Sequence, residues 1–120
     1  MTTPNYLNDL QQRLRAFAAE RDWEQFHTPK NLACALSVEA SELLELFQWL
    51  TDTQAQRMPN DPQFAEHLGE EVADVLLYLL RLADVCGLDL PAVVERKLKL
   101  NAEKYPVALA RGHARKYDAL

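Results

Sequence analysis

The sequence predicts an all-α protein, a four-helix subunit that assembles into a larger helical-bundle oligomer. Apolar residues recur at intervals of three and four, the spacing of one helix face, and no stretch alternates like a half-buried strand. Start and stop signals divide the 120 residues into segments of helical length. A chain of this length forms one compact core, so we expect a single domain over residues 1–120, with 107–120 as a basic tail.

The first expected helix has its apolar residues on a single stripe, formed by Leu7, Leu10, Leu14 and Phe17. Asn5 is its expected N-cap, and the polar pair at 21–22 ends it. The three later helices each open on a cap residue followed by proline, which suits the first helical turn. These signals are Thr28-Pro29, Asp61-Pro62, and Asp89 with Pro91.

The ends of these helices are marked less sharply. The second should run to about residue 50 and be followed by a polar turn over 51–61. The third should end near Cys86, because Gly87 is a helix stop, and Pro106 should close the fourth. The tail over 107–120 has no apolar period and is either mobile or docked on a neighbouring element.

Composition and charge exclude several classes of protein. The net charge of −5 disfavours a general nucleic-acid binder, which needs a basic surface. No apolar run reaches the roughly 18 residues that span a bilayer, and the amino terminus lacks a basic-then-apolar signal. We therefore expect a cytoplasmic protein with no membrane partner. Cys34 and Cys86 have apolar neighbours and are expected to be buried, reduced thiols.

The second and third expected helices are apolar on most of their circumference, as in VADVLLYLLRLADV over 72–85. Such helices must be covered on all sides, and four helices from 120 residues cover two of them poorly. This pattern predicts a homo-oligomer.

Two pairs of acidic residues stand inside these apolar helices. Glu39 and Glu42 are three residues apart in SVEASELLELFQWL, and Glu71 and Asp74 repeat that spacing in EEVAD. Helices joined by a short connection pack antiparallel, so the two pairs can face each other. Four converging carboxylates repel unless a cation binds them, and an all-oxygen set without His or Cys suits Mg²⁺ or Mn²⁺. Mg²⁺ commonly binds substrate phosphates as well, which implies a polyphosphate site.

Each pair also has a simpler explanation, because glutamates three apart on a helix usually form only a solvated face. Glu45 is either exposed, a ligand or a support for one, and Glu70 is an alternative to Glu71. Other residues that suit a nucleotide also have both a functional and a structural explanation. Trp49 and Tyr78 are either base-stacking or core aromatics. The lysines near Asn101, namely Lys97, Lys99 and Lys104, either bind phosphate or form a solvated basic face, and His27 is expected to be a loop or capping residue.

Three stretches together resemble one family. ERDWEQFHTPKNLACALSVEASELLELFQW, EEVADVLLYLLRLAD and KLKLNAEKYP are similar to the MazG-like all-α nucleoside triphosphate pyrophosphohydrolases, most of all to their dCTP pyrophosphatase branch. The similarity covers nearly the whole chain, to the closing RKYDAL. The family's ExxE and ExxD signature falls on Glu39, Glu42, Glu71 and Asp74.

The resemblance implies a helical subunit, usually in a tetramer built from dimers, that hydrolyses a nucleoside triphosphate to the monophosphate and pyrophosphate with Mg²⁺. It assigns the metal to the four acids of the signature. It assigns the base to Trp23, Trp49, Tyr78 and Asn101. In that branch the first helix contributes a histidine to this pocket, and this chain has Leu14 at that position. The resemblance therefore predicts the reaction more firmly than the preferred base.

The resulting hypothesis is metal-assisted hydrolysis of dCTP or a modified pyrimidine dNTP, which would sanitise the nucleotide pool. Lys97, Lys104 or Tyr105 would bind the phosphate tail. Two alternatives stay open: a related enzyme with another nucleotide substrate, such as dUTP, a purine or a phosphoribosyl-ATP-like compound, and a non-catalytic helical interaction module.

Overall fold

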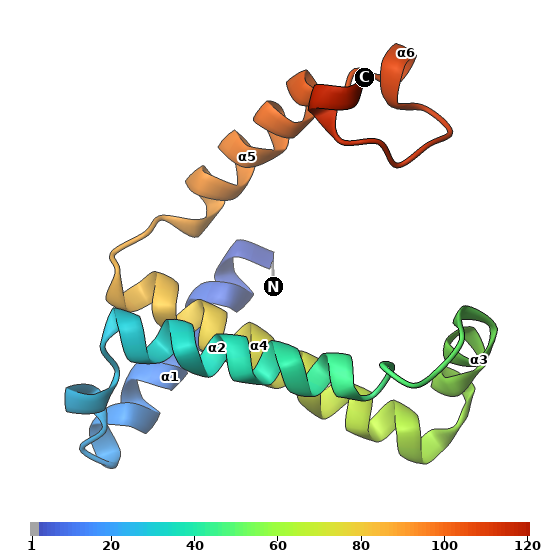
Figure 1. The fold of residues 1–120 in the computed structure, drawn as a ribbon. Helices are drawn as coiled ribbons and strands as arrows, with labels where there is room; N and C mark the ends of the chain where they lie inside the picture. The colour runs from blue at the N-terminus through green and yellow to red at the C-terminus, as the bar shows by residue number, and fades with distance from the viewer. Residues whose placement is uncertain (1–2) are drawn as a thin grey trace. The chain divides into compact units, whose positions relative to one another are not determined.

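The computed structural model describes residues 3–120, and over these residues it contains helices and no strand (Figure 1). The all-α prediction is therefore confirmed. In chain order the elements are α1 (Thr3–Glu20), η1 (Glu24–Phe26), α2 (Pro29–Glu45), α3 (Asp52–Arg57), η2 (Met58–Asn60), α4 (Pro62–Val85), α5 (Leu90–Lys104), α6 (Val107–Ala110) and η3 (Tyr117–Ala119). In the part of the chain that is described, no helix is long and apolar enough to cross a membrane.

The chain divides into two compact units, Met1–Gly87 and Leu88–Leu120. In the first unit α4 packs against both α1 and α2, and α2 and α4 lie side by side in opposite directions (Figure 1). Its core residues come from these three helices: Leu10, Ala18, Leu32, Leu80 and Ala83. The long contact between α2 and α4 is what brings the two acidic pairs of the sequence onto facing surfaces.

The three capping signals that are followed by proline work as expected. Thr28 accepts a hydrogen bond from the backbone N–H of Asn31 at 3.2 Å, and Asp61 and Asp89 cap α4 and α5 in the same way. Each cap satisfies a backbone donor that the helix leaves unpaired in its first turn. After α4, Gly87 has φ +68°, a left-handed conformation that glycine adopts without strain, and its N–H bonds the carbonyl of Asp84.

Several boundaries differ from the prediction. α1 begins at Thr3, so Asn5 lies inside the helix and is not its N-cap. α2 ends at Glu45, about five residues early, because the backbone tightens: the N–H of Phe47 bonds the carbonyl of Leu44, three residues back, at 2.9 Å. Trp49 therefore lies beyond α2 and not on its face, as the sequence spacing had suggested.

The stretch expected to be a turn contains the short helix α3. Thr51 and Gln54 form a reciprocal capping box there, with each side chain bonded to the other residue's backbone N–H. Such a box satisfies two backbone donors locally, which favours a helix over the turn suggested by polarity.

The tail also has local structure, because Tyr117 packs edge-on against Tyr105 at the end of α5, with ring centroids 6.3 Å apart. The cysteines Cys34 and Cys86 are reduced as expected but exposed, so their predicted burial is wrong.

Candidate metal and nucleotide site

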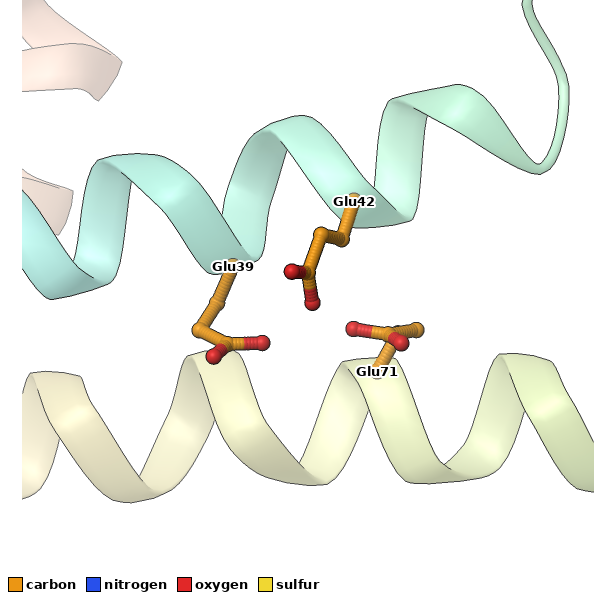
Figure 2. A group of neighbouring side chains, drawn as sticks. All are labelled: Glu39, Glu42 and Glu71. Atoms are coloured by element: carbon orange, nitrogen blue, oxygen red, sulfur yellow. The ribbon is translucent and has the colours of Figure 1, made fainter.

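Three of the four acids of the signature converge between α2 and α4. Glu39 and Glu42 project from α2 and Glu71 projects from α4 toward them, as Figure 2 shows. One carboxylate oxygen from each residue lies within 4.8 Å of the others. Oxygens at such separations can ligate one hard divalent cation, whose oxygen ligands lie at about 2.0–2.6 Å.

Two of these oxygens have no partner that would explain their burial. Oε2 of Glu39 and Oε2 of Glu71 are closed off from solvent, and neither is hydrogen-bonded to any residue that the structure describes. A buried, unpaired carboxylate oxygen is costly and is normally paired with a donor or a metal. The donor set therefore fits a divalent cation.

The proton affinity of the cluster reflects the same crowding. Burial, a hydrogen bond with Glu42, and the charges of Glu42, Asp74 and Glu71 raise the pKa of Glu39 to about 7. Burial and the charge of Glu42 also raise the pKa of Glu71. Asp74 contributes to both shifts, so it acts electrostatically with the cluster although it lies outside the group of converging oxygens.

The raised pKa of Glu39 predicts how stability depends on pH in the absence of metal. The Glu39 carboxyl group binds its proton more tightly in the folded state than in the unfolded state. Its contribution to the free energy of unfolding is therefore fully present below the unfolded pKa near 4.5 and is lost as pH rises through about 7. We expect the melting temperature in EDTA to fall over that range, and Mg²⁺ to restore it at pH 8. Glu39→Gln should have a shallower pH dependence in EDTA, measured by thermal unfolding. Equal slopes for the variant and the wild type would contradict the assignment.

A cavity of about 360 Å³ opens in the first unit next to these acids. Its lining combines α1, the loop around η1 and one face of α4: Leu14, Phe17, Trp23, His27, Asp74, Leu77, Tyr78 and Arg81. Small-molecule sites are typically of this kind, about 300–1,000 Å³, mostly apolar and aromatic with a few polar groups. Asp74 belongs to the cavity wall and also acts on Glu39 and Glu71, so the acidic cluster and the cavity are adjoining parts of one site.

Two of the four residues that the resemblance assigned to the base, Trp23 and Tyr78, line the cavity. Leu14 also lines it, at the position where the resemblance placed a histidine. Trp23 is 43% exposed and packs edge-on against Phe17, with ring centroids 5.7 Å apart. The helical spacing of Asp74 and Tyr78 correctly indicated a shared face.

Other expected residues are not among those that line the cavity. Trp49 is 87% exposed and is not in the lining of the cavity. Four substrate candidates are on or at the end of α5, in the second unit: Lys97, Asn101, Lys104 and Tyr105. Their roles stay predictions. The sequence left open whether Glu45 is a ligand and whether Glu70 takes the place of Glu71. In the structure Glu45 and Glu70 are exposed and outside the converging group, whereas Glu71 is inside it.

The sequence reading did not identify Arg81 as a site residue. It is buried among apolar residues of α4, yet its Nε donates a hydrogen bond to Nδ1 of His27, 54 positions earlier, at 3.0 Å. Asp84 lies one turn further along α4. Its carboxylate accepts two hydrogen bonds from Arg15, from Nε at 2.6 Å and from Nη2 at 2.5 Å. The only signal in the sequence was an arginine inside the run LLYLLRLADV.

Comparisons with known proteins identify the family of this chain. The MazG-like family profile matches residues 34–120. Over 114 residues, 95% of this chain, the sequence is 49% identical to dCTP pyrophosphatase 1 of Mus musculus and 48% identical to dCTP pyrophosphatase 1 of Homo sapiens, spanning 67% of each relative. A crystal structure of a pyrophosphatase from Archaeoglobus fulgidus has a TM-score of 0.78 and 40% identity, covering 84% of this chain and 93% of that one. The chain therefore belongs to the MazG-like family.

Proposed function

We propose that this protein is a divalent-metal-dependent nucleoside triphosphate pyrophosphohydrolase that acts on dCTP or a related, modified pyrimidine deoxynucleotide. One observation carries the proposal: a cluster of converging carboxylates adjoins an aromatic cavity, because Asp74 lines the cavity and its charge acts on the cluster. A nucleotide has the matching shape, with charged phosphates at one end and a flat apolar ring at the other. The names of the relatives from mouse and human support the reaction and the base.

Glu39, Glu42, Glu71 and Asp74 would hold the cation, with Mg²⁺ as the proposed ion and Mn²⁺ as a substitute. When bound, such an ion supplies Lewis acidity toward phosphate oxygens and lowers the pKa of a coordinated water. The glutamates of the cluster would orient the attacking water and accept its proton.

The cavity residues bind and orient the nucleoside. Trp23 presents a ring on which a base can stack, while Leu14, Phe17 and Leu77 exclude water from the site. Because Asp74 is the acid at the cavity wall, the carboxylates meet the phosphate chain at its nucleoside end. Water would therefore attack the α-phosphorus, and the bond to the bridging oxygen would break with pyrophosphate as the leaving group.

A panel of nucleoside triphosphates with Mg²⁺, assayed for pyrophosphate release, tests the proposal. We expect dCTP to be hydrolysed with a higher kcat/KM than dATP or dGTP, because a pocket that hydrogen-bonds one base edge rejects others. In ¹⁸O-water the label should appear in the monophosphate. Label in pyrophosphate would mean attack at the β-phosphorus, and release of orthophosphate would mean a different reaction. No hydrolysis of any nucleotide would favour the non-catalytic interaction module.

We also propose that the subunit self-associates, as a dimer or a tetramer. The supporting observation is the number of large apolar side chains left exposed on the two central helices of the first unit: Val38, Leu44, Val72, Leu76 and Leu79. Apolar surface of this kind is normally covered by a partner. Light scattering at micromolar concentration tests this proposal, and a monomer there would remove it.

A further inference from the structure

Arg81 is a buried cation in the wall of the cavity. Arg81 is 9% exposed. Among the buried residues in the described part of the first unit, it is the one that is polar. Its shortest hydrogen bond is the one to Nδ1 of His27 at 3.0 Å, whereas its Nη1 lies at 3.5 Å from Asp84. Since Asp84 is already paired with Arg15 by two short bonds, compensation of Asp84 is not a sufficient reason for Arg81.

The bond between Arg81 and His27 fixes the state of the imidazole. An arginine side chain stays protonated and can only donate, so Nδ1 of His27 must be the acceptor. Burial and the positive charge of Arg81 lower the pKa of His27, which keeps the ring neutral. The ring proton therefore sits on Nε2. Within residues 3–120, Nε2 makes no hydrogen bond, and His27 is one of the residues that line the cavity.

The position along α4 places Arg81, and with it the His27 that it bonds, at the end of the cavity away from Asp74. Glu71, Asp74, Tyr78 and Arg81 follow one another at spacings of three, four and three, so they lie on one helix face. The rise from Asp74 to Arg81 is about 10 Å at 1.5 Å per residue. A nucleotide whose α-phosphate lies near Asp74 reaches about this far with the edge of its base.

We propose that His27 reads the base through its Nε2–H, and that Arg81 is the positioning residue that holds His27 in this donor form. This inference rests on the proposed function and names its selective element. Cytosine offers an acceptor at ring atom N3, with the O2 carbonyl beside it. Uracil and thymine carry a hydrogen on N3, which would oppose a second donor. The pair therefore selects cytosine over the other two pyrimidines.

Binding of nucleoside monophosphates tests the proposal without depending on hydrolysis. Calorimetry should show that the wild-type protein binds dCMP more tightly than dTMP and dUMP in Mg²⁺. Arg81→Met removes the donor while keeping an apolar chain, so His27 can place its proton on either nitrogen. We expect the preference to fall about tenfold, since one unmatched buried hydrogen bond costs about 1–3 kcal/mol. Arg81→Lys, which keeps a cationic donor, should recover part of it.

Arg15→Met is the matched control. It removes the other arginine bound to Asp84 but has no contact with His27, so the preference for dCMP should be unchanged. If Arg15→Met lowers the preference as much as Arg81→Met, the effect comes from packing and the proposal fails. Should Arg81→Met not fold, His27→Ala gives the same test, because removal of the donor must also erode the preference.

Nitrogen-15 NMR of the His27 imidazole measures which ring nitrogen carries the proton. A purely structural role of Arg81 would leave this protonation unchanged in Arg81→Met. We expect Nε2 to be protonated and Nδ1 bare in the wild type, and a mixture of both forms in Arg81→Met. A proton on Nδ1 in the wild type would overturn the proposal. So would an unchanged preference for dCMP in Arg81→Met. A retained preference for dCMP without hydrolysis of any triphosphate would instead refute the proposed function and leave the base reading intact.

Discussion

Replacing Glu71 with glutamine is expected to abolish nucleotide hydrolysis, with a loss in kcat/KM of about 1,000-fold or more. Oε2 of Glu71 is buried without a hydrogen-bond partner and lies in the group of converging oxygens with Glu39 and Glu42. The amide keeps the shape of the side chain but removes the charge that binds a divalent cation. Pyrophosphate release at saturating Mg²⁺ measures the loss, and Glu39→Gln and Asp74→Asn should behave alike.

The fold should survive this change. Removing one charge from a crowded acidic cluster relieves repulsion, so the metal-free variant should melt at the same temperature as the wild type or above it. Glu70→Gln is the matched control, because Glu70 is the adjacent residue, is exposed and lies outside the cluster. Glu45→Gln controls for α2 in the same way. Turnover near the wild-type level in Glu71→Gln, Glu39→Gln and Asp74→Asn would show that these acids do not hold the catalytic metal.

Trp23→Ala is expected to raise the dissociation constant for every nucleotide by about 5- to 150-fold, because stacking on an aromatic ring contributes roughly 1–3 kcal/mol and tolerates any base. Trp23 is the largest aromatic side chain in the cavity lining. The ranking of bases should be kept, since stacking does not read the hydrogen-bonding edge. Calorimetric titration with dCMP, dTMP and dAMP in Mg²⁺ measures both the affinity and the ranking.

Tyr6→Ala is a suitable control for this prediction. Tyr6 is an exposed aromatic residue of α1 that does not line the cavity, so its removal should leave nucleotide binding unchanged. The same titration on Trp49→Ala tests whether this exposed residue contributes to stacking, as the family resemblance implied. Unchanged affinity in Trp23→Ala would mean that the base binds outside the cavity.

The starts of α2, α4 and α5 were predictable from the sequence because they depend on neighbouring residues alone. Thr28, Asp61 and Asp89 each bond backbone donors two or three positions away, and a proline follows each within two residues. Where the prediction failed, a second local interaction competed with the first pattern. The capping box of Thr51 formed α3 in a polar stretch, and i to i+3 bonding ended α2 at Glu45.

By itself the sequence determined the helical fold, the family resemblance and the pairing of the acids within each helix, because residues three apart on a helix share a face wherever the helix goes. Glu39 with Glu42 and Glu71 with Asp74 could therefore be paired before any packing was known. Only the tertiary structure decided which acids converge, that Trp23 and Tyr78 share a cavity, and that Arg81 bonds His27 across 54 positions. The physical reason is range: helix periodicity and capping act within a turn or two, whereas a hydrogen bond between α4 and the loop before α2 exists only once the helices have packed.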